Sequence, residues 1–407
     1  MKKLVYQMEN LSGGITAVNG IDAAGVHCGL KNNGDKDLAL IYSREPAVAA
    51  GVFTTNRFKA PPLLVTEQHL AGTVRAIVIN SGIANSCTGE QGMADARTMA
   101  LLTAQKLGLQ EEEVLVASTG VIGVYLPMQK ITAGVEQAAS LLSAAGGSDA
   151  ARAIMTTDKV AKESAARFTL EGDARSFVIA GMAKGSGMIC PDMATMLAFL
   201  ATDINVEREL LQEALQEAVA HSFNLISVDG DTSTNDMVLL LAQGGSTPQL
   251  EKDSPLWPAF KNALLHICRD LAYKVVADGE GVTKVIKLTV RGAVDYAMGR
   301  RLARSVLNST LVKTAFFGED ANWGRIITAM GYAGVDFIPE RVDVYLGNVQ
   351  VMAAGKGLVF NETAAREVLM QQEIPVLIDL KLGTEEVTGW GSDLSYEYVT
   401  INSAYRS

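Results

Sequence analysis

The sequence predicts an α+β fold with a strand-rich C-terminal part. The first half of the chain alternates apolar runs with helix-like patterns, as in residues 75–82 followed by 94–108. The middle contains two long amphipathic patterns, 207–223 and 257–277. In the last third, apolar and polar residues alternate over short runs, which is typical of a sheet with one wetter face.

The helices are predicted from apolar spacing and from stop signals. Segment 94–108 has helical spacing and ends at Gly108, a common helix terminator. A further helix is predicted over 134–147. The two long patterns each place apolar residues on one stripe: Leu211, Leu215 and Val219 in the first, and Phe260, Leu264, Leu271 and Val275 in the second.

Buried strands are predicted where apolar runs end in turns, over 75–82, 113–123 and 175–187. Four alternating runs predict the strands of the C-terminal third. They are KVIKLTVRGAV, RVDVYLGNVQV, PVLIDLKLG and LSYEYVTIN. We expect them to form a subdomain at roughly 284–407.

Composition narrows the class of protein. The chain has 407 residues, 48% hydrophobic and 20% charged, so it can bury a large core. Its formal charge of -10 disfavours nucleic-acid binding, which needs a basic face. The four cysteines form no C-x-x-C pair. No signal peptide or long uncharged apolar run is visible, and we expect a soluble cytoplasmic protein.

Few residues qualify for acid–base or metal chemistry. The neighbours His27 and Cys28 suggest either a nucleophile pair or a buried structural segment. VDGDTSTND (228–236) could hold Mg²⁺ or Ca²⁺ through oxygen ligands, although it lacks the spacing of an EF-hand loop. A turn capped by polar side chains is the alternative, and the same holds for DGEG (278–281).

Two glycine-containing segments follow predicted strands. KGSG (184–187) could hold an anion with backbone N–H groups and the lysine charge, but it lacks P-loop spacing. STG (118–120) could direct two N–H groups at one point, the geometry of an oxyanion hole. A plain turn is the simpler interpretation of each.

Thr195 begins the apolar run of KGSGMICPDMATMLAFLATD (184–203). A structural threonine inside a buried element is the simpler interpretation. A threonine is a poor nucleophile without a base, and no base lies at an obvious spacing from Thr195. Cleavage of the Ala194–Thr195 bond would supply a base. The new α-amine, with a reference pKa of about 7.7–8.0, could take the hydroxyl proton.

The block KGSGMI-x-P-x-MATML is accompanied along the chain by other distinctive segments. They include GVFTTNRFKAPP, IVINSGIANSCTGEQG, ASTGVIG, IMTTD, SFNLISVDGDTSTND, DGEGVTK, VKTAFFGEDANWGRI and YVTINSAYRS. In this order they resemble the glutamate N-acetyltransferase / ornithine acetyltransferase family of arginine biosynthesis, over nearly the whole chain. The resemblance implies a layered αββα-type, N-terminal-nucleophile-like sandwich with a smaller strand-rich C-terminal subdomain.

The resemblance also implies roles for single residues. The precursor would cut itself between Ala194 and Thr195 into an α chain, 1–194, and a β chain, 195–407. Thr195 would be the nucleophile, and Thr119 and Gly120 would form the oxyanion hole. The implied substrate-binding residues are Thr156 or Thr157, Lys184, Thr195, Glu280, Asn402 and Ser407.

The implied reaction moves an acetyl group from N²-acetyl-L-ornithine to L-glutamate by ping-pong chemistry, without a metal or organic cofactor. The cation of Lys184 suits the donor carboxylate and the anion of Glu280 suits its ammonium group. Acetyl-CoA stays open as a second donor. VDGDTSTND and DGEG then become structural or substrate-lining turns rather than metal sites. We expect an α2β2 heterotetramer with no nucleic-acid or membrane partner.

Three other interpretations stay open at the level of the sequence. The same self-processed threonine could serve an aminopeptidase or amidase, with water as acceptor. The acidic turn and KGSG could belong to a metal-dependent phosphoryl-transfer enzyme. A non-catalytic binding protein could retain the scaffold.

Overall fold

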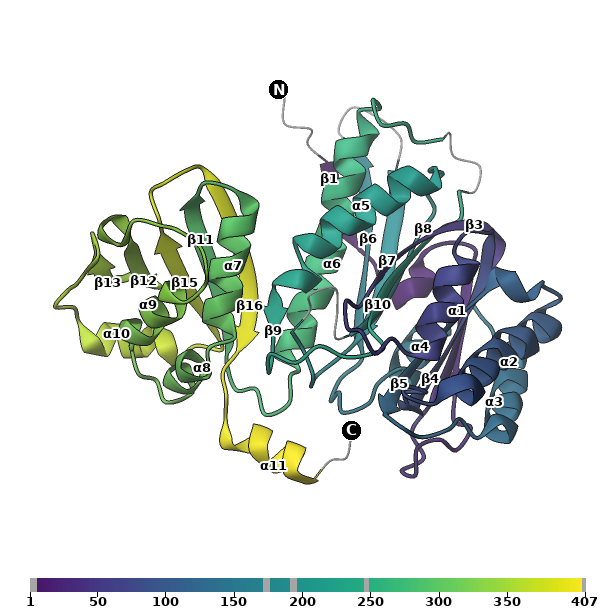
Figure 1. The fold of residues 1–407 in the computed structure, drawn as a ribbon. Helices are drawn as coiled ribbons and strands as arrows, with labels where there is room; N and C mark the ends of the chain where they lie inside the picture. Colours follow the sequence, from purple (N-terminus) through teal and green to yellow (C-terminus); the bar gives the residue numbers. More distant parts are fainter. Residues whose placement is uncertain (1–5, 171–175, 191–195, 245–248, 405–407) are drawn as a thin grey trace.

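The structure, a computed structural model, describes residues 6–170, 176–190, 196–244 and 249–404. Within these residues the strands form two sheets that are accompanied by helices (Figure 1). The predicted α+β class is confirmed. Ala194, Thr195 and Ser407 lie outside the described residues.

The larger sheet has nine strands in the order β1-β6-β7-β8-β10-β3-β4-β5, with β2 paired to β3. They are β1 (Tyr6–Asn10), β2 (Ile21–Val26), β3 (Leu38–Phe53), β4 (Val74–Ile83), β5 (Val114–Val121), β6 (Lys162–Leu170), β7 (Ser176–Lys184), β8 (Leu197–Thr202) and β10 (Met237–Ala242). The 16-residue β3 pairs with β2 and β4 through its first half and with β10 through 48–53. One long strand therefore belongs to two layers.

Three apolar cores show how these layers are stacked. On β10, the neighbours Leu239 and Leu240 enter different cores, because successive side chains point to opposite faces of a strand. Leu240 packs with α5 (Arg208–Ala220) and α6 (Leu256–Ala277). Leu239 shares a core with β4 and β5, whose other face packs on α2 (Gly89–Leu107) and α3 (Met128–Ser140). The strands of the larger sheet therefore form two stacked layers with one core between them, and helices cover the outer face of each layer. This is the expected αββα layering.

The smaller sheet has seven strands in the order β14-β13-β12-β15-β11-β16-β9. They are β9 (Ile226–Ser227), β11 (Val285–Ala293), β12 (Asp343–Leu346), β13 (Val349–Ala353), β14 (Lys356–Gly357), β15 (Glu373–Asp379) and β16 (Glu385–Ser392). Its strands share one core with α7 (Tyr296–Leu307), α8 (Thr310–Phe317), α9 (Trp323–Gly331) and α10 (Glu362–Leu369). Figure 1 shows this unit beside the sandwich, joined to it through β9.

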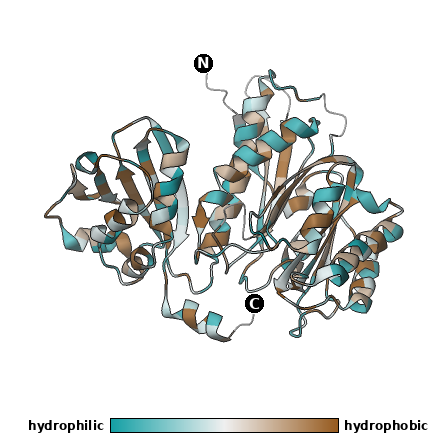
Figure 2. Ribbon diagram, viewed as in Figure 1, coloured by the Kyte–Doolittle hydropathy of each residue, from teal (hydrophilic) through white to brown (hydrophobic). Residues whose placement is uncertain are grey.

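The remaining described helices are α1 (Pro61–His69), α4 (Gly147–Ala153), α11 (Tyr396–Ala404) and the short 3₁₀ helices Gly14–Ala17, Glu111–Glu113, Phe223–Leu225 and Pro339–Arg341. Hydrophobic residues follow the strands of the sandwich, and hydrophilic residues lie along its outer helices (Figure 2). No helix in the described part of the chain is long and apolar enough to cross a membrane.

One predicted helix has different bounds, and one predicted strand is wrong. The helix expected over 134–147 is α3, which begins after Pro127 and ends at Ser140. The strand expected at LSYEYVTIN is the helix α11. Its Tyr, Val and Thr residues favour strands, but Ser395 caps a helix here, because its Oγ accepts the Tyr398 N–H at 3.4 Å.

Candidate active site

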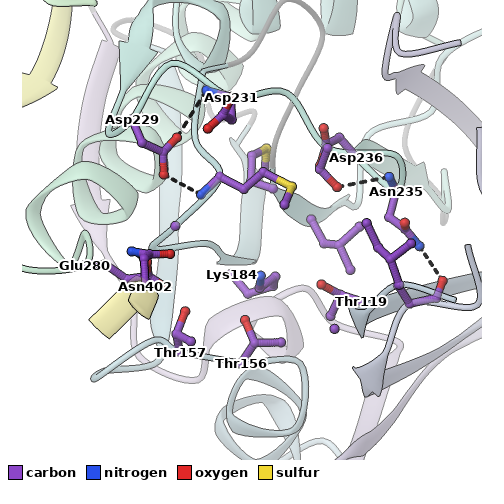
Figure 3. Close-up of a pocket in the computed structure, with 18 of the residues that line it drawn as sticks. Thr119, Thr156, Thr157, Lys184, Asp229, Asp231, Asn235, Asp236, Glu280 and Asn402 are labelled. Atoms are coloured by element: carbon purple, nitrogen blue, oxygen red, sulfur yellow. Dashed lines mark hydrogen bonds between the residues drawn. The ribbon is translucent and has the colours of Figure 1, made fainter. Parts of the chain in front are cut away.

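A cavity of about 210 Å³ opens at the ends of β5 and β7. The sequence-predicted site residues that the structure describes all line it (Figure 3): Thr119, Gly120, Thr156, Thr157, Lys184, Glu280 and Asn402. Met196, which follows Thr195 in the sequence, lines it too. Segments far apart in the chain therefore meet at one place, while the roles of these residues stay predictions.

Thr119 and Gly120 lie at the end of β5, where it pairs with the end of β4. Gly120 has φ 131° and pairs with Gly82. A Cβ on Gly120 would lie 2.2 Å from the carbonyl carbon of Gly82. This close approach and the positive φ both require glycine at position 120.

Lys184 ends β7 and is 8% exposed. Burial lowers the pKa of its ammonium group, and the carboxylate of Asp158 opposes that shift. Asp158 also accepts the N–H of Gly185 at 2.7 Å and that of Thr156 at 2.9 Å. One buried carboxylate thus holds the KGSG loop against the loop that carries Thr156 and Thr157.

Asp158 is ionised because cations surround it. Burial alone would raise its pKa, but Lys184 and then Lys162 lower the pKa to about 2. Lys162 Nζ lies 2.6 Å from Asp158 and 2.6 Å from Asp278, and all three side chains are buried. Asp278 begins the DGEG turn, so this ion cluster joins a third cavity-lining segment to the other two.

The KGSG loop also contacts Thr157 and Glu280 directly. The hydroxyls of Thr157 and Ser186 are 2.6 Å apart, and the Ser186 carbonyl accepts the Glu280 N–H at 2.8 Å. A Cβ on Gly187 would lie 2.4 Å from the Glu280 carboxyl carbon. Glycine at this position therefore lets the Glu280 carboxylate approach the loop, and Asn402 Nδ2 donates to that carboxylate at 2.8 Å.

The acidic stretch 228–236 lines the same cavity through Asp229, Asp231, Asn235 and Asp236. The Asp229 carboxylate accepts the N–H groups of Met188 at 2.6 Å and Ile189 at 2.8 Å. Burial raises the pKa of Asp229. No group of three His, Cys, Asp or Glu residues in the described ranges has the geometry of a metal site.

Tyr398 also lines the cavity and was missed at the level of the sequence. Burial, and then the neighbouring Asp229, raise the pKa of its hydroxyl. Tyr398 and Asn402 are four residues apart on α11, so they share one face of that helix. Because 394–402 was predicted as a strand, this helical spacing carried no signal.

The pair His27 and Cys28 is not part of this cavity. Burial and the nearby Asp37 raise the pKa of the Cys28 thiol to about 12. His27 Nδ1 lies 2.7 Å from the carbonyl of Asp35. A thiol that stays protonated is a poor nucleophile at neutral pH, so the nucleophile interpretation of this pair has no support.

The model of the ArgJ family matches residues 22–407. The chain belongs to the ArgJ family. A relative from Symbiobacterium thermophilum, named arginine biosynthesis bifunctional protein ArgJ, is 52% identical over 98% of this chain and 100% of its own length. The Bacillus subtilis relative of the same name is 45% identical and covers 98% of each chain.

Solved structures are also similar to this chain. One is an arginine biosynthesis bifunctional protein ArgJ from Bacillus halodurans, 40% identical, covering 50% of this chain and 96% of that chain with a TM-score of 0.49. Another is an ornithine acetyltransferase complexed with ornithine from Mycobacterium tuberculosis, 42% identical, covering 46% of this chain and 100% of that chain with a TM-score of 0.43. Family membership confirms the predicted class of enzyme, an acyltransferase of arginine biosynthesis.

Proposed function

We propose that the chain cleaves itself between Ala194 and Thr195 and then transfers an acetyl group from N²-acetyl-L-ornithine to L-glutamate. Thr195 is the nucleophile and forms the acetyl-enzyme. The observation that supports this most strongly is the single cavity lined by Thr119, Gly120, Lys184 and Glu280, because Met196, the next residue after Thr195, lines it as well.

In the first half-reaction the α-amine of Thr195 takes the proton of its own hydroxyl. The hydroxyl oxygen attacks the acetamide carbon of the donor, and the carbonyl oxygen becomes an oxyanion that Thr119 and Gly120 stabilise. The C–N bond then breaks, the proton passes to the departing ornithine amine, and the acetyl group stays on Thr195 as an ester.

In the second half-reaction the amine of L-glutamate attacks this ester. N-acetylglutamate leaves, and the proton returns to the hydroxyl of Thr195. Lys184 binds the carboxylate of the amino-acid substrate and Glu280 binds the distal ammonium of ornithine, since the cavity contains both charges. Of the two neighbouring threonines, Thr156 is the proposed contact, because the hydroxyl of Thr157 already pairs with Ser186.

No metal or organic cofactor takes part in the proposed scheme. Acetyl-CoA is a candidate second donor, as the bifunctional names of the relatives suggest. Glutamate-dependent release of CoA from acetyl-CoA tests the second donor.

An α2β2 heterotetramer is the proposed assembly, and a measurement of the native mass tests it.

Intact-mass analysis under denaturing conditions tests the cleavage. The wild type is expected to give two species, 1–194 and 195–407. Thr195→Ala is expected to stay whole, whereas Thr314→Ala, at an exposed helical threonine, is cut like the wild type. A wild type that stays whole argues against self-cleavage.

A transfer assay separates the proposal from an amidase. Radiolabelled acetyl from N²-acetyl-L-ornithine is expected to appear in N-acetylglutamate, and the label is expected on residues 195–407 when glutamate is omitted. Rapid release of free acetate without glutamate indicates an N-terminal-threonine amidase or aminopeptidase, which uses water as the acceptor.

A further inference from the structure

We propose that Asn235 is a positioning residue for the oxyanion hole, because it closes a ring of hydrogen bonds around Thr119 and Gly120. The inference rests on the proposed function, in which those two residues stabilise the oxyanion. Asn235 itself was noticed in the sequence only as part of an acidic turn.

The side-chain amide of Asn235 joins two backbone segments. Its Nδ2 donates to the carbonyl of Ser118 at 2.9 Å and to the carbonyl of Ala84 at 2.6 Å. The side chain is buried, with 5% of the residue exposed. Two carbonyl acceptors identify the group that faces them as the NH₂ and not the oxygen, because an amide oxygen donates no hydrogen bond.

The ring is completed by Ala84 and Val121. The Ala84 N–H donates to the carbonyl of Val121 at 2.9 Å. The contacts therefore run from Ser118 through Asn235 to Ala84 and back to Val121. Thr119 and Gly120 are the residues between Ser118 and Val121, so their backbone forms the covalent side of a ring that hydrogen bonds close.

A fixed carbonyl determines the orientation of the neighbouring N–H group. The peptide unit is planar, so holding the Ser118 carbonyl also holds the direction of the Thr119 N–H. The Ser118 side chain adds a second anchor, because its Oγ donates to Asn80 Oδ1 at 2.6 Å. Gly120 is held from the side by the backbone of Gly82, its partner on β4.

Orientation matters here because an oxyanion hole works through donors that are already in place. Removing one donor of this kind lowers kcat by roughly 10²- to 10³-fold. A displacement of about 1 Å in a catalytic group can cost about 10²-fold. Loss of the Asn235 amide would also leave two buried carbonyl oxygens without their donor, beside a site where negative charge develops.

The loop that carries Asn235 is itself anchored, so it can serve as a reference point. Thr54 Oγ1 donates to the Ser233 carbonyl at 2.9 Å, and the Thr54 N–H donates to the Asp236 carbonyl at 3.0 Å. Asn235 is two residues before Met237, which pairs with Leu197 of β8. The ring thus connects the end of β5 to the strand that follows Thr195 in the sequence.

The test uses Asn235→Ala, Asn235→Asp and a matched control, Asn56→Ala. Asn56 makes a similar bond to the same loop without reaching β5. Rates are expressed per cleaved chain, as counted by mass spectrometry. We expect Asn235→Ala to lower kcat by about ten- to a hundredfold with an unchanged donor KM, and Asn235→Asp to lower it further, because a carboxylate repels the two carbonyls. Asn56→Ala keeps the wild-type kcat.

Hydrogen–deuterium exchange of the segment 118–121 measures the ring without relying on catalysis. Exchange there is expected to be faster in Asn235→Ala and unchanged in Asn56→Ala. An unchanged kcat in Asn235→Ala overturns the inference, and so does an equal loss in Asn56→Ala or a loss that appears in KM. If Asn235→Asp does not fold, Asn235→Ala alone decides.

The two proposals can fail separately. A wild type that transfers no acetyl group refutes the proposed function, and unchanged exchange in Asn235→Ala refutes the ring. If the wild type is active and Asn235→Ala has the wild-type kcat, only the positioning role is refuted.

Discussion

The charge of the Glu280 carboxylate can be removed with little change of shape by Glu280→Gln. Glu280 is 7% exposed, it lines the cavity, and Asn402 donates to it. We expect Glu280→Gln to raise the KM for N²-acetyl-L-ornithine by roughly ten- to a hundredfold, because a hydrogen bond to a charged group contributes about 1.5–3 kcal/mol. Steady-state kinetics with saturating glutamate measure the change.

The control for Glu280→Gln is Glu251→Gln, an exposed carboxylate outside the cavity. It should leave the donor KM as in the wild type. An unchanged KM in Glu280→Gln would remove Glu280 from the ammonium site.

Lys184 gives the enzyme a predictable response to pH. Only the protonated ammonium attracts the donor carboxylate, and burial lowers the pKa of this group below the ordinary 10.5. As pH rises through that lowered pKa, the charged fraction falls, so the donor KM should rise at a lower pH than for an ordinary lysine. The other charges that act on Lys184 are Asp158, Lys162, Asp236 and Glu280.

Lys184→Arg is the control for this pH dependence. Its guanidinium stays charged over the whole range, so its donor KM should not rise on the alkaline side, whatever its value at neutral pH. A parallel rise in both proteins would show that another group causes it. The measurement is donor KM against pH from neutral to alkaline values.

Between elements, the ion cluster of Asp158, Lys162 and Asp278 holds three loops of the site together. The cluster is buried, so removing the Lys162 cation takes the ion-pair partner from two carboxylates, of which Asp158 still has Lys184 nearby. Breaking a buried ion pair in this way costs about 3–5 kcal/mol. We expect Lys162→Met to lower the free energy of unfolding by this amount, as measured by urea denaturation.

Lys252→Met is the matched control, because Lys252 pairs with Glu213 at the same 2.6 Å but in solvent. An exposed pair contributes only about 0.2–1 kcal/mol. Similar losses in the two variants would show that burial of the cluster adds nothing to stability.

Elements that bury one regular face could be predicted from the sequence, and the others could not. The helices α2, α5 and α6 follow from apolar spacing, since each packs one stripe on a sheet. α11 has no fully buried residue, so its sequence carries no such stripe. Its Tyr, Val and Thr residues favour strands, and the sequence therefore predicts a strand there. The cavity-lining residues came from motif resemblance. The contact between Lys162 and Asp278 joins residues 116 positions apart, and only the fold brings them together.

At the scale of the whole molecule, the predicted cut divides the chain in sequence but not in space. β8 and β10 follow residue 195, and they lie in the middle of the larger sheet. β7 flanks them on one side and β3 on the other, and both of those strands precede residue 194. The core between the two layers likewise mixes residues from both segments, such as Ile77 and Leu239. Neither segment can keep this sheet without the other.

We therefore expect the two cleaved chains to stay together in native buffer and to unfold as one unit. Separating them would expose both edges of the β8–β10 pair and much of two apolar cores to water, which is strongly unfavourable. Native mass spectrometry should show particles that contain both segments in equal number, and urea should remove helical signal and association in a single transition. Release of 1–194 before the loss of helical signal would mean that the segments are held by a smaller interface than the shared sheet provides.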